Sequence, residues 1–225
     1  MLGCSDDAVE ADLGLDFYPM AVDAFWIYEV TETTYVDRVE TIESYQLRES
    51  FFRSDTLGDL VTFYRRIERR QDDTENWNSI GQVALRQTNQ RLEYQDANQI
   101  FIRMTYPIRL CETDNFGLLI GTDGRTCREW DGNSTNTGDA ELIHYEEPAN
   151  GDFSFENAEQ VKVVISDLPA NFVKEDMRFE LYARNIGLVE RNFTEIEFCT
   201  TGCSEANERE NGYILVQRLI AYGTF

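Results

Sequence analysis

Apolar and polar side chains alternate one by one along much of the chain. Trp26, Tyr28 and Val30, for example, occupy every second position of a segment rich in aromatic and β-branched residues. A period of two residues is typical of a β-strand with one buried face. The segments with this pattern, each predicted to contain a strand, are 26–31, 45–52, 61–68, 100–104, 142–145, 161–165, 177–184 and 213–222.

Short polar clusters separate the first of these segments, at residues 56–59, 72–76 and 95–98. Connections of two to five residues cannot form a parallel crossover, so the strands are predicted to run antiparallel. A chain of 225 residues can form one all-β domain. We therefore predict that residues 17–225 form a single all-β domain, an antiparallel meander that makes a curved sheet, a partly open barrel or a sandwich.

Apart from residues 142–145, the range 107–151 lacks this alternation, and it contains six glycines and a long polar stretch. A loop of this length in a compact domain is often functional. We expect a ligand-binding site here, with Trp130, Asp131, Asn133 and Asp139 as its candidate residues. The oxygen side chains at alternate positions also resemble a calcium loop, but they lack the sixth-position glycine and terminal glutamate of an EF-hand. A solvated loop is favoured over a calcium site, so no cofactor is predicted and calcium is the alternative.

The chain carries a formal net charge of −22. This charge excludes a nucleic-acid partner, because phosphates require a basic surface. The acidic residues are spread along the chain, and we interpret them as a well-solvated surface.

The first residues indicate a lipid anchor. Leu2-Gly3-Cys4 looks like the end of a bacterial lipobox, in which a small residue precedes an acylated cysteine. Lipidation of Cys4 would make the bilayer a partner, and residues 1–16, acidic and poor in large apolar side chains, are predicted to be a disordered tether. Serine and acidic residues directly after the cysteine also resemble the export signal of Bacteroidetes-type lipoproteins. A chance cysteine near the terminus is the alternative.

The cysteine count agrees with an oxidising compartment. Five cysteines leave one over after pairing, and Cys4 accounts for it. Proximity favours a disulfide between Cys111 and Cys127 and another between Cys199 and Cys203. A zinc site made by these four is the alternative, although their spacing is unusual for a zinc finger.

Two short segments carry a family resemblance. Residues 17–28 resemble the Tyr-Pro-Leu-x-x-Gly-x-x-Trp-x-Tyr opening of Bacteroidetes-type exported lipoproteins of uncharacterised function, with Asp23 or Ala24 in place of the glycine. Residues 182–189 resemble the Tyr-Ala-Lys-Gly-x-Gly-Leu-Val hairpin of the same proteins, with Asn185 in place of the first glycine. The resemblance implies an outer-membrane, lipid-anchored protein. Asp55-Thr56-Leu57 further resembles the O-glycan acceptor of such proteins, so Thr56 is a candidate modification site.

No residue is assigned a catalytic role. The one histidine, His144, lies in an apolar segment and is interpreted as a strand residue, and no common catalytic motif occurs. We predict a non-enzymatic outer-membrane or surface lipoprotein that binds an unknown envelope protein, a small ligand or a glycan. The alternatives are a glycan-directed hydrolase with paired carboxylates and a structural subunit of an envelope complex.

Overall fold

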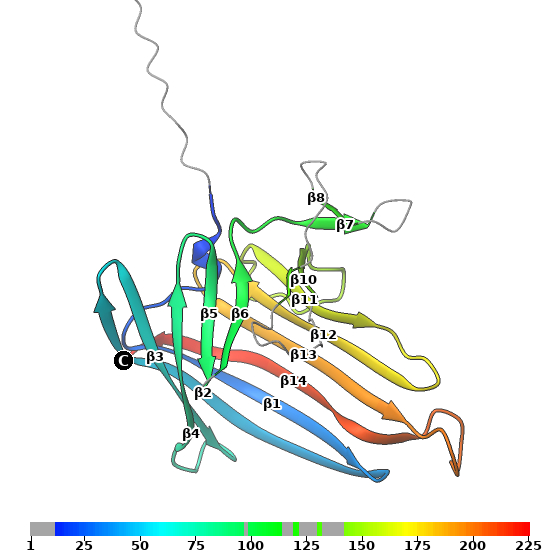
Figure 1. Ribbon diagram of the computed structural model, residues 1–225. Coiled ribbons are helices and arrows are strands. Elements are labelled where there is room, and N and C mark those ends of the chain that lie inside the picture. Colours follow the sequence, from blue (N-terminus) through cyan, green and yellow to red (C-terminus); the bar gives the residue numbers. More distant parts are fainter. Residues whose placement is uncertain (1–11, 97–98, 114–118, 122–129, 132–141) are drawn as a thin grey trace, which may run out of the picture.

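The structure, a computed structural model, describes residues 12–96, 99–113, 119–121, 130–131 and 142–225. These residues form a 3-10 helix, η1 (Leu15–Phe17), followed by strands and their connections (Figure 1). The strands are β1 (Ala24–Val36), β2 (Val39–Leu57), β3 (Leu60–Arg70), β4 (Asn78–Gln87), β5 (Arg91–Asp96), β6 (Gln99–Thr105), β7 (Cys111–Thr113), β8 (Leu119–Gly121), β9 (Trp130–Asp131), β10 (Leu142–Glu146), β11 (Gln160–Leu168), β12 (Lys174–Ala183), β13 (Gly187–Phe198) and β14 (Arg209–Thr224).

All strands except β7 and β8 belong to one sheet of 12 strands, in the order β6-β5-β4-β3-β2-β1-β14-β13-β12-β11-β10-β9. Every pairing in this sheet is antiparallel. The sheet consists of two meanders that join where β1 pairs with β14, close to the two ends of the described chain. The predicted all-β antiparallel meander is therefore confirmed.

The sheet curves until its first strands face its last ones. Arg103 of β6 donates a hydrogen bond to the Glu180 carboxylate of β12 over 3.3 Å. The backbone N–H of Thr105, at the end of β6, donates to the hydroxyl of Tyr145 in β10 over 2.6 Å. An isolated bridge also joins Leu110, after β6, to Tyr145. The sheet is therefore strongly curved, and within the described residues its end strands β6 and β9 do not pair with each other.

The predicted inward residues line the concave face. Trp26, Tyr28 and Val30 of β1 are buried, whereas Glu29 and Thr31, which alternate with Tyr28 and Val30, are exposed. Together with apolar side chains of the neighbouring strands and of η1 they form the main core. Each strand leaves one face in solvent. The sheet is therefore stabilised by the apolar surface that the strands bury on the other, concave face.

The turn between β1 and β2 is a two-residue hairpin. Asp37 and Arg38 both have positive φ, of 48° and 71°. Two such residues make a type I′ turn, whose twist matches the strands on either side. The sequence here is Asp-Arg, whereas type I′ turns are usually recognised from Asn-Gly or Asp-Gly. This turn was therefore not predicted.

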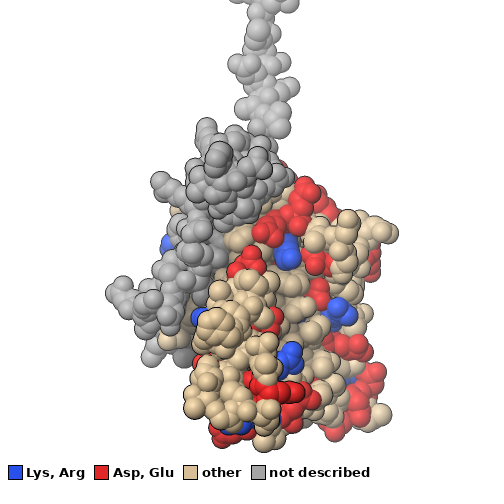
Figure 2. All heavy atoms as spheres, turned by 90° about the vertical axis from the view of Figure 1, so that its right-hand side faces the viewer, with Lys and Arg blue, Asp and Glu red and all other residues tan. Residues whose placement is uncertain are grey.

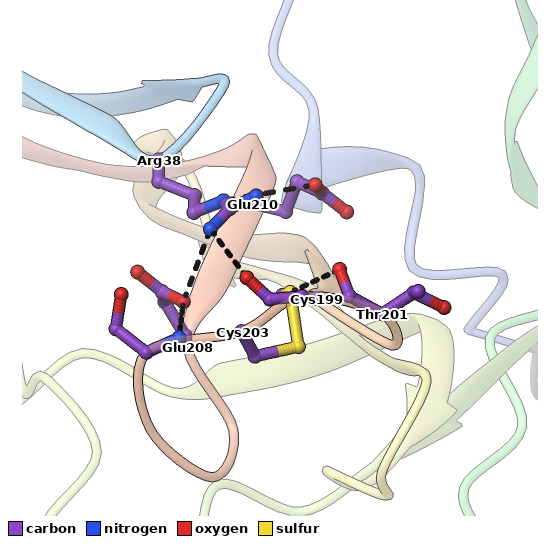
Figure 3. The surroundings of a disulfide bond; sticks show 8 residues. Arg38, Cys199, Thr201, Cys203, Glu208 and Glu210 are labelled. Carbon is purple, nitrogen blue, oxygen red and sulfur yellow. Dashed lines mark hydrogen bonds and ion pairs between the residues drawn. A yellow bond between two sulfur atoms is a disulfide. The ribbon is translucent and has the colours of Figure 1, made fainter.

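A disulfide closes the connection between β13 and β14. Cys199 is bonded to Cys203, as the sequence predicted, and their Cα atoms lie 5.7 Å apart. Arg38, at the tip of the β1–β2 hairpin, donates to the carbonyl of Gly202 over 3.2 Å and lies 3.6 Å from Glu208 (Figure 3). The disulfide loop and the hairpin tip therefore support each other, and two sulfurs of the alternative zinc site are bonded together.

The described part of the predicted tether lies against the folded body. The carbonyl of Asp16 accepts a hydrogen bond from the N–H of Asn185 over 2.8 Å. Arg184 forms ion pairs with Asp16 at 2.6 Å and Asp12 at 3.0 Å. Residues 12–16 are thus held at the β12–β13 turn, and the predicted tether can extend only over residues that precede them.

The prediction that the charges form a well-solvated surface is correct for most of them but not for all. Figure 2 shows acidic side chains around much of one face of the molecule. Glu49, Glu68, Glu180, Glu190 and Arg65 are nevertheless buried. For these five the prediction is wrong, because each carboxylate has an arginine partner and Arg65 has a carboxylate partner.

Candidate functional site

Two regions of the described chain combine polar side chains with a hollow, one inside the curved sheet and one on its outer surface. Inside, the guanidinium of Arg65 donates to the Glu49 carboxylate over 2.6 Å and to the hydroxyl of Tyr18 over 2.8 Å. Burial raises the pKa of Tyr18 to about 12, so the phenol stays protonated. This pair holds β2, β3 and the segment after η1 together.

A second buried cluster surrounds Glu180 of β12. Arg191 donates to its carboxylate over 2.7 Å, and the hydroxyl of Tyr182 donates to its other oxygen over 2.5 Å. Burial alone would raise the pKa of Glu180, but Arg191 and then Arg103 outweigh it and lower the pKa to about 2. A glycosidase acid needs a raised pKa instead, so Glu180 is suited to hold the fold and not to donate a proton.

The hollow inside the sheet is small. Its volume is about 10 Å³, and Tyr18, Trp26, Tyr28, Glu49 and Arg65 are among its lining residues. A volume of this size accommodates about one water molecule. This hollow therefore has no space for a ligand larger than a water molecule.

The outer surface of β3, β4 and β5 forms a larger hollow of about 320 Å³, which we call the trough. Tyr64 of β3, Ala84 of β4 and Gln95 of β5 face one another in register, so they form one row across the three strands. The small side chain of Ala84 makes the floor between the two longer ones. The remaining outward residues of the trough lie at its two ends and are Thr62, Gln82 and Arg86.

The ring of Tyr64 is held from one side. Arg53 of β2 is the cross-strand partner of Tyr64. Its guanidinium lies over the Tyr64 ring, 4.1 Å from the ring centroid. Arg53 thus covers one face of the Tyr64 ring, and Tyr64 and Ala84 both line the trough. Phe52 lies 6.4 Å from Tyr64, with Arg66 4.9 Å over the Phe52 ring. These contacts fix an aromatic face at the wall of the trough before any ligand binds.

Adjacent strands lie about 4.8 Å apart, so Tyr64 and Gln95, two strands apart, are separated by about 10 Å at the backbone. A ligand ring between these two side chains would lie about 3.5–4 Å from the atoms on either side of it. The trough therefore has the width for a single ring placed against Tyr64. Its lining is mostly hydroxyl, amide and guanidinium groups, and the one cation, Arg86, lies 3.9 Å from Glu93.

The predicted site in the long irregular segment falls mostly outside the described residues. Asn133 and Asp139 lie outside them, and of Trp130 and Asp131 only the backbone of β9 is described. The ligand-binding and calcium predictions for this segment therefore stay predictions. Among the described residues no cluster of His, Cys, Asp and Glu side chains could hold a metal ion.

The other predicted residues are placed as follows. Cys4 and Cys127 lie outside the described residues, so the lipidation stays a prediction and the Cys111–Cys127 pairing is not tested. Cys111, at the start of β7, takes part in a disulfide. Thr56 is exposed near the end of β2, where a modifying enzyme could reach it. His144 lies in β10, as expected, with its Nε2 atom 2.8 Å from Glu146.

The two segments that carry the family resemblance pack against each other. The indole N–H of Trp26 donates to the carbonyl of Ile186 over 2.5 Å, and a Cβ on Gly187 would lie 3.4 Å from the same nitrogen. Asn185 has a φ of 62° and Asp23 a φ of 69°, so both adopt the conformation that glycine accepts most easily. Residues 160 positions apart thus form one joint between the two meanders.

No protein-family model matches the sequence, and no curated protein matches it. Two solved structures are similar in fold. One, from Bacteroides fragilis, is named as an exported protein with a YmcC-like fold; it has 11% identity and a TM-score of 0.40, over 92% of this chain and 99% of that one. The other, named as a lipoprotein from Parabacteroides distasonis, has 11% identity and a TM-score of 0.38, over 92% of this chain and 98% of that one. At this identity the similarity to both structures concerns the fold alone.

None of the described residues belongs to a helix that is long and apolar enough to cross a membrane.

Proposed function

We propose that this chain is a lipid-anchored protein of the bacterial outer membrane or cell surface that binds a ligand without chemical turnover. The trough on β3–β5 is the observation that carries the binding role. It is open to solvent, and its aromatic wall is fixed in advance by Arg53. A site that is ordered before binding loses less side-chain entropy when the ligand arrives.

The buried charges favour a binding role over a hydrolytic one. Glu49 and Glu180 are each hydrogen-bonded to an arginine inside the core. Carboxylates held in this way stabilise one arrangement of the strands and are not available to a substrate. The rival hydrolase, with carboxylates in residues 107–151, stays a prediction.

The lipid anchor rests on the sequence of the N-terminus and on the cysteine count. Cys199 and Cys203 are bonded to each other and Cys111 is also in a disulfide. The predicted Cys111–Cys127 pairing would leave Cys4 as the one cysteine available for acylation. Residues 12–16 lie against the folded body, so an anchor at Cys4 would be close to it along the chain.

The anchor is tested by mass spectrometry of the full-length gene product, purified from its own envelope with detergent. We expect the mass of a diacylglycerol group on Cys4, since acyl chains hold proteins that lack a spanning helix. A Cys4→Ala variant should move to the aqueous fraction, whereas the matched Ser5→Ala variant should stay with the membrane. A free thiol at Cys4 in the natural product would contradict this part of the proposal.

A further inference from the structure

We infer that the trough binds one ring of an uncharged saccharide, stacked on the free face of Tyr64; this inference rests on the proposed binding function. A pyranose ring presents C–H groups on its faces and hydroxyl groups around its rim. Tyr64 offers an aromatic face to the first, and Gln82, Gln95, Thr62 and Arg86 offer hydrogen bonds to the second. The width between β3 and β5 admits one such ring.

The position of the trough argues against a peptide added as a further strand. Ala84 lies on β4, which is hydrogen-bonded to β3 on one side and to β5 on the other. Its backbone groups are used within the sheet, so a peptide could not pair with them. Only side chains remain to recognise an occupant.

The charge of the trough argues against a phosphate or another anion. Arg86 is the one cationic lining residue, and Glu93 lies opposite it at 3.9 Å. Two of its nitrogens also lie 3.4 Å from the hydroxyl of Thr62. A chain of net charge −22 would repel an anion as it approached. A neutral ligand with many hydroxyl groups pays no such cost.

The lining also argues against a lipid chain. Tyr64 and Ala84 are the only outward residues of the trough with mainly apolar side chains, and amides and a guanidinium surround them. Burying an acyl chain there would remove water from these polar groups and offer them no hydrogen bond in exchange. A ring with an apolar face and a polar rim satisfies both kinds of group.

The test is calorimetric titration of the full chain with methyl glycosides of glucose, galactose, mannose, N-acetylglucosamine and N-acetylgalactosamine. Methyl glucuronide and inorganic phosphate serve as charged probes. We expect at least one neutral glycoside to bind, and Tyr64→Ala to weaken that binding about tenfold, as the loss of one stacking contact implies. The matched Tyr222→Ala variant, which removes an exposed tyrosine of β14, should bind as the unchanged protein does.

A second variant distinguishes the loss of the binding site from misfolding of Tyr64→Ala. Ala84→Leu fills the floor of the trough with a side chain that points away from the core, and it should abolish binding while the melting temperature is kept. Binding that neither variant changes would overturn the inference, and so would binding of the glucuronide or phosphate in place of every neutral glycoside.

The same variants separate this inference from the proposed function. If no glycoside binds, but the protein captures envelope material that is lost in Tyr64→Ala and destroyed by protease, the saccharide inference fails and the binding function stands. If nothing binds at the trough in either experiment, both fail.

Discussion

Replacing Glu180 by alanine is expected to lower the free energy of unfolding by about 3–5 kcal/mol. The carboxylate is 1% exposed and is the shared partner of Arg191 and Arg103. Its removal leaves two guanidinium groups partly buried without a countercharge, and the hydroxyl of Tyr182 without its acceptor. Urea unfolding at neutral pH measures the change.

The Glu180 carboxylate also makes the free energy of unfolding depend on pH in the acid range. Its ordinary pKa of 4.5 falls to about 2 in the folded protein, so the folded state favours the ionised form. The stability that it contributes is fully present above pH 4.5 and is lost as the pH falls toward 2. The unchanged protein should therefore lose more stability across this window than Glu180→Ala does.

The matched control is Glu159→Ala. Glu159 also pairs with an arginine, Arg184, at 2.8 Å, but it is 64% exposed. An exposed pair contributes about 0.2–1 kcal/mol, and this variant should change stability by no more than that. Equal losses in the two variants would mean that the buried cluster around Glu180 does not hold the sheet together.

Replacing Trp26 by alanine should cost about 3–5 kcal/mol, as for other large buried aromatic residues. The indole packs edge-on against Phe51 with ring centroids 5.6 Å apart, and its N–H reaches Ile186 in the turn between β12 and β13. The variant therefore loosens the joint between the two meanders. Thermal and urea unfolding both measure the loss.

Trp26→Phe separates the hydrogen bond from the packing. It keeps an aromatic ring but leaves the Ile186 carbonyl without its donor, which should cost about 1–3 kcal/mol. Phe172→Ala serves as the control, since Phe172 is 81% exposed and its loss should stay within about 0.5 kcal/mol. If Trp26→Phe were as stable as the unchanged protein, the contact with Ile186 would not contribute.

The sequence predicted the strands whose inward and outward residues differ in polarity. In β1 the alternation of Trp26, Tyr28 and Val30 with polar neighbours was sufficient. In β4 it fails, because Gly81 is on the inward face while Ile80 points outward and is exposed. A strand with a small residue inside and an apolar one outside has no period of two, and β4 was not predicted.

The buried charges and the trough could not be predicted for a related reason. Glu49 and Arg65 fit the inward period of their strands, but only the pairing of β2 with β3 brings their side chains together. Tyr64 lies on the outward face of β3, in the trough. Its partners in the trough lie on β4 and β5, and the pattern of these strands gives no sign of a site.

The prediction of a site in residues 107–151 followed from loop length and glycine content. That prediction stays untested, and the described chain has a further hollow on the regular part of the sheet, where a small residue, Ala84, lies between longer ones. A small residue between longer ones on neighbouring strands can be recognised only when the strand register is known. Sequence patterns find faces of strands more readily than they find neighbours across strands.

The central claim is that the outer face of β3–β5 binds the ligand, and in-cell photo-crosslinking tests it most directly. A photoreactive phenylalanine analogue would replace Gln82 in the trough and, in a second variant, Phe172 at the β11–β12 turn. Irradiation of the native host should give an adduct from position 82 and none from position 172. Adducts from position 172 alone, or from neither position, would contradict the account.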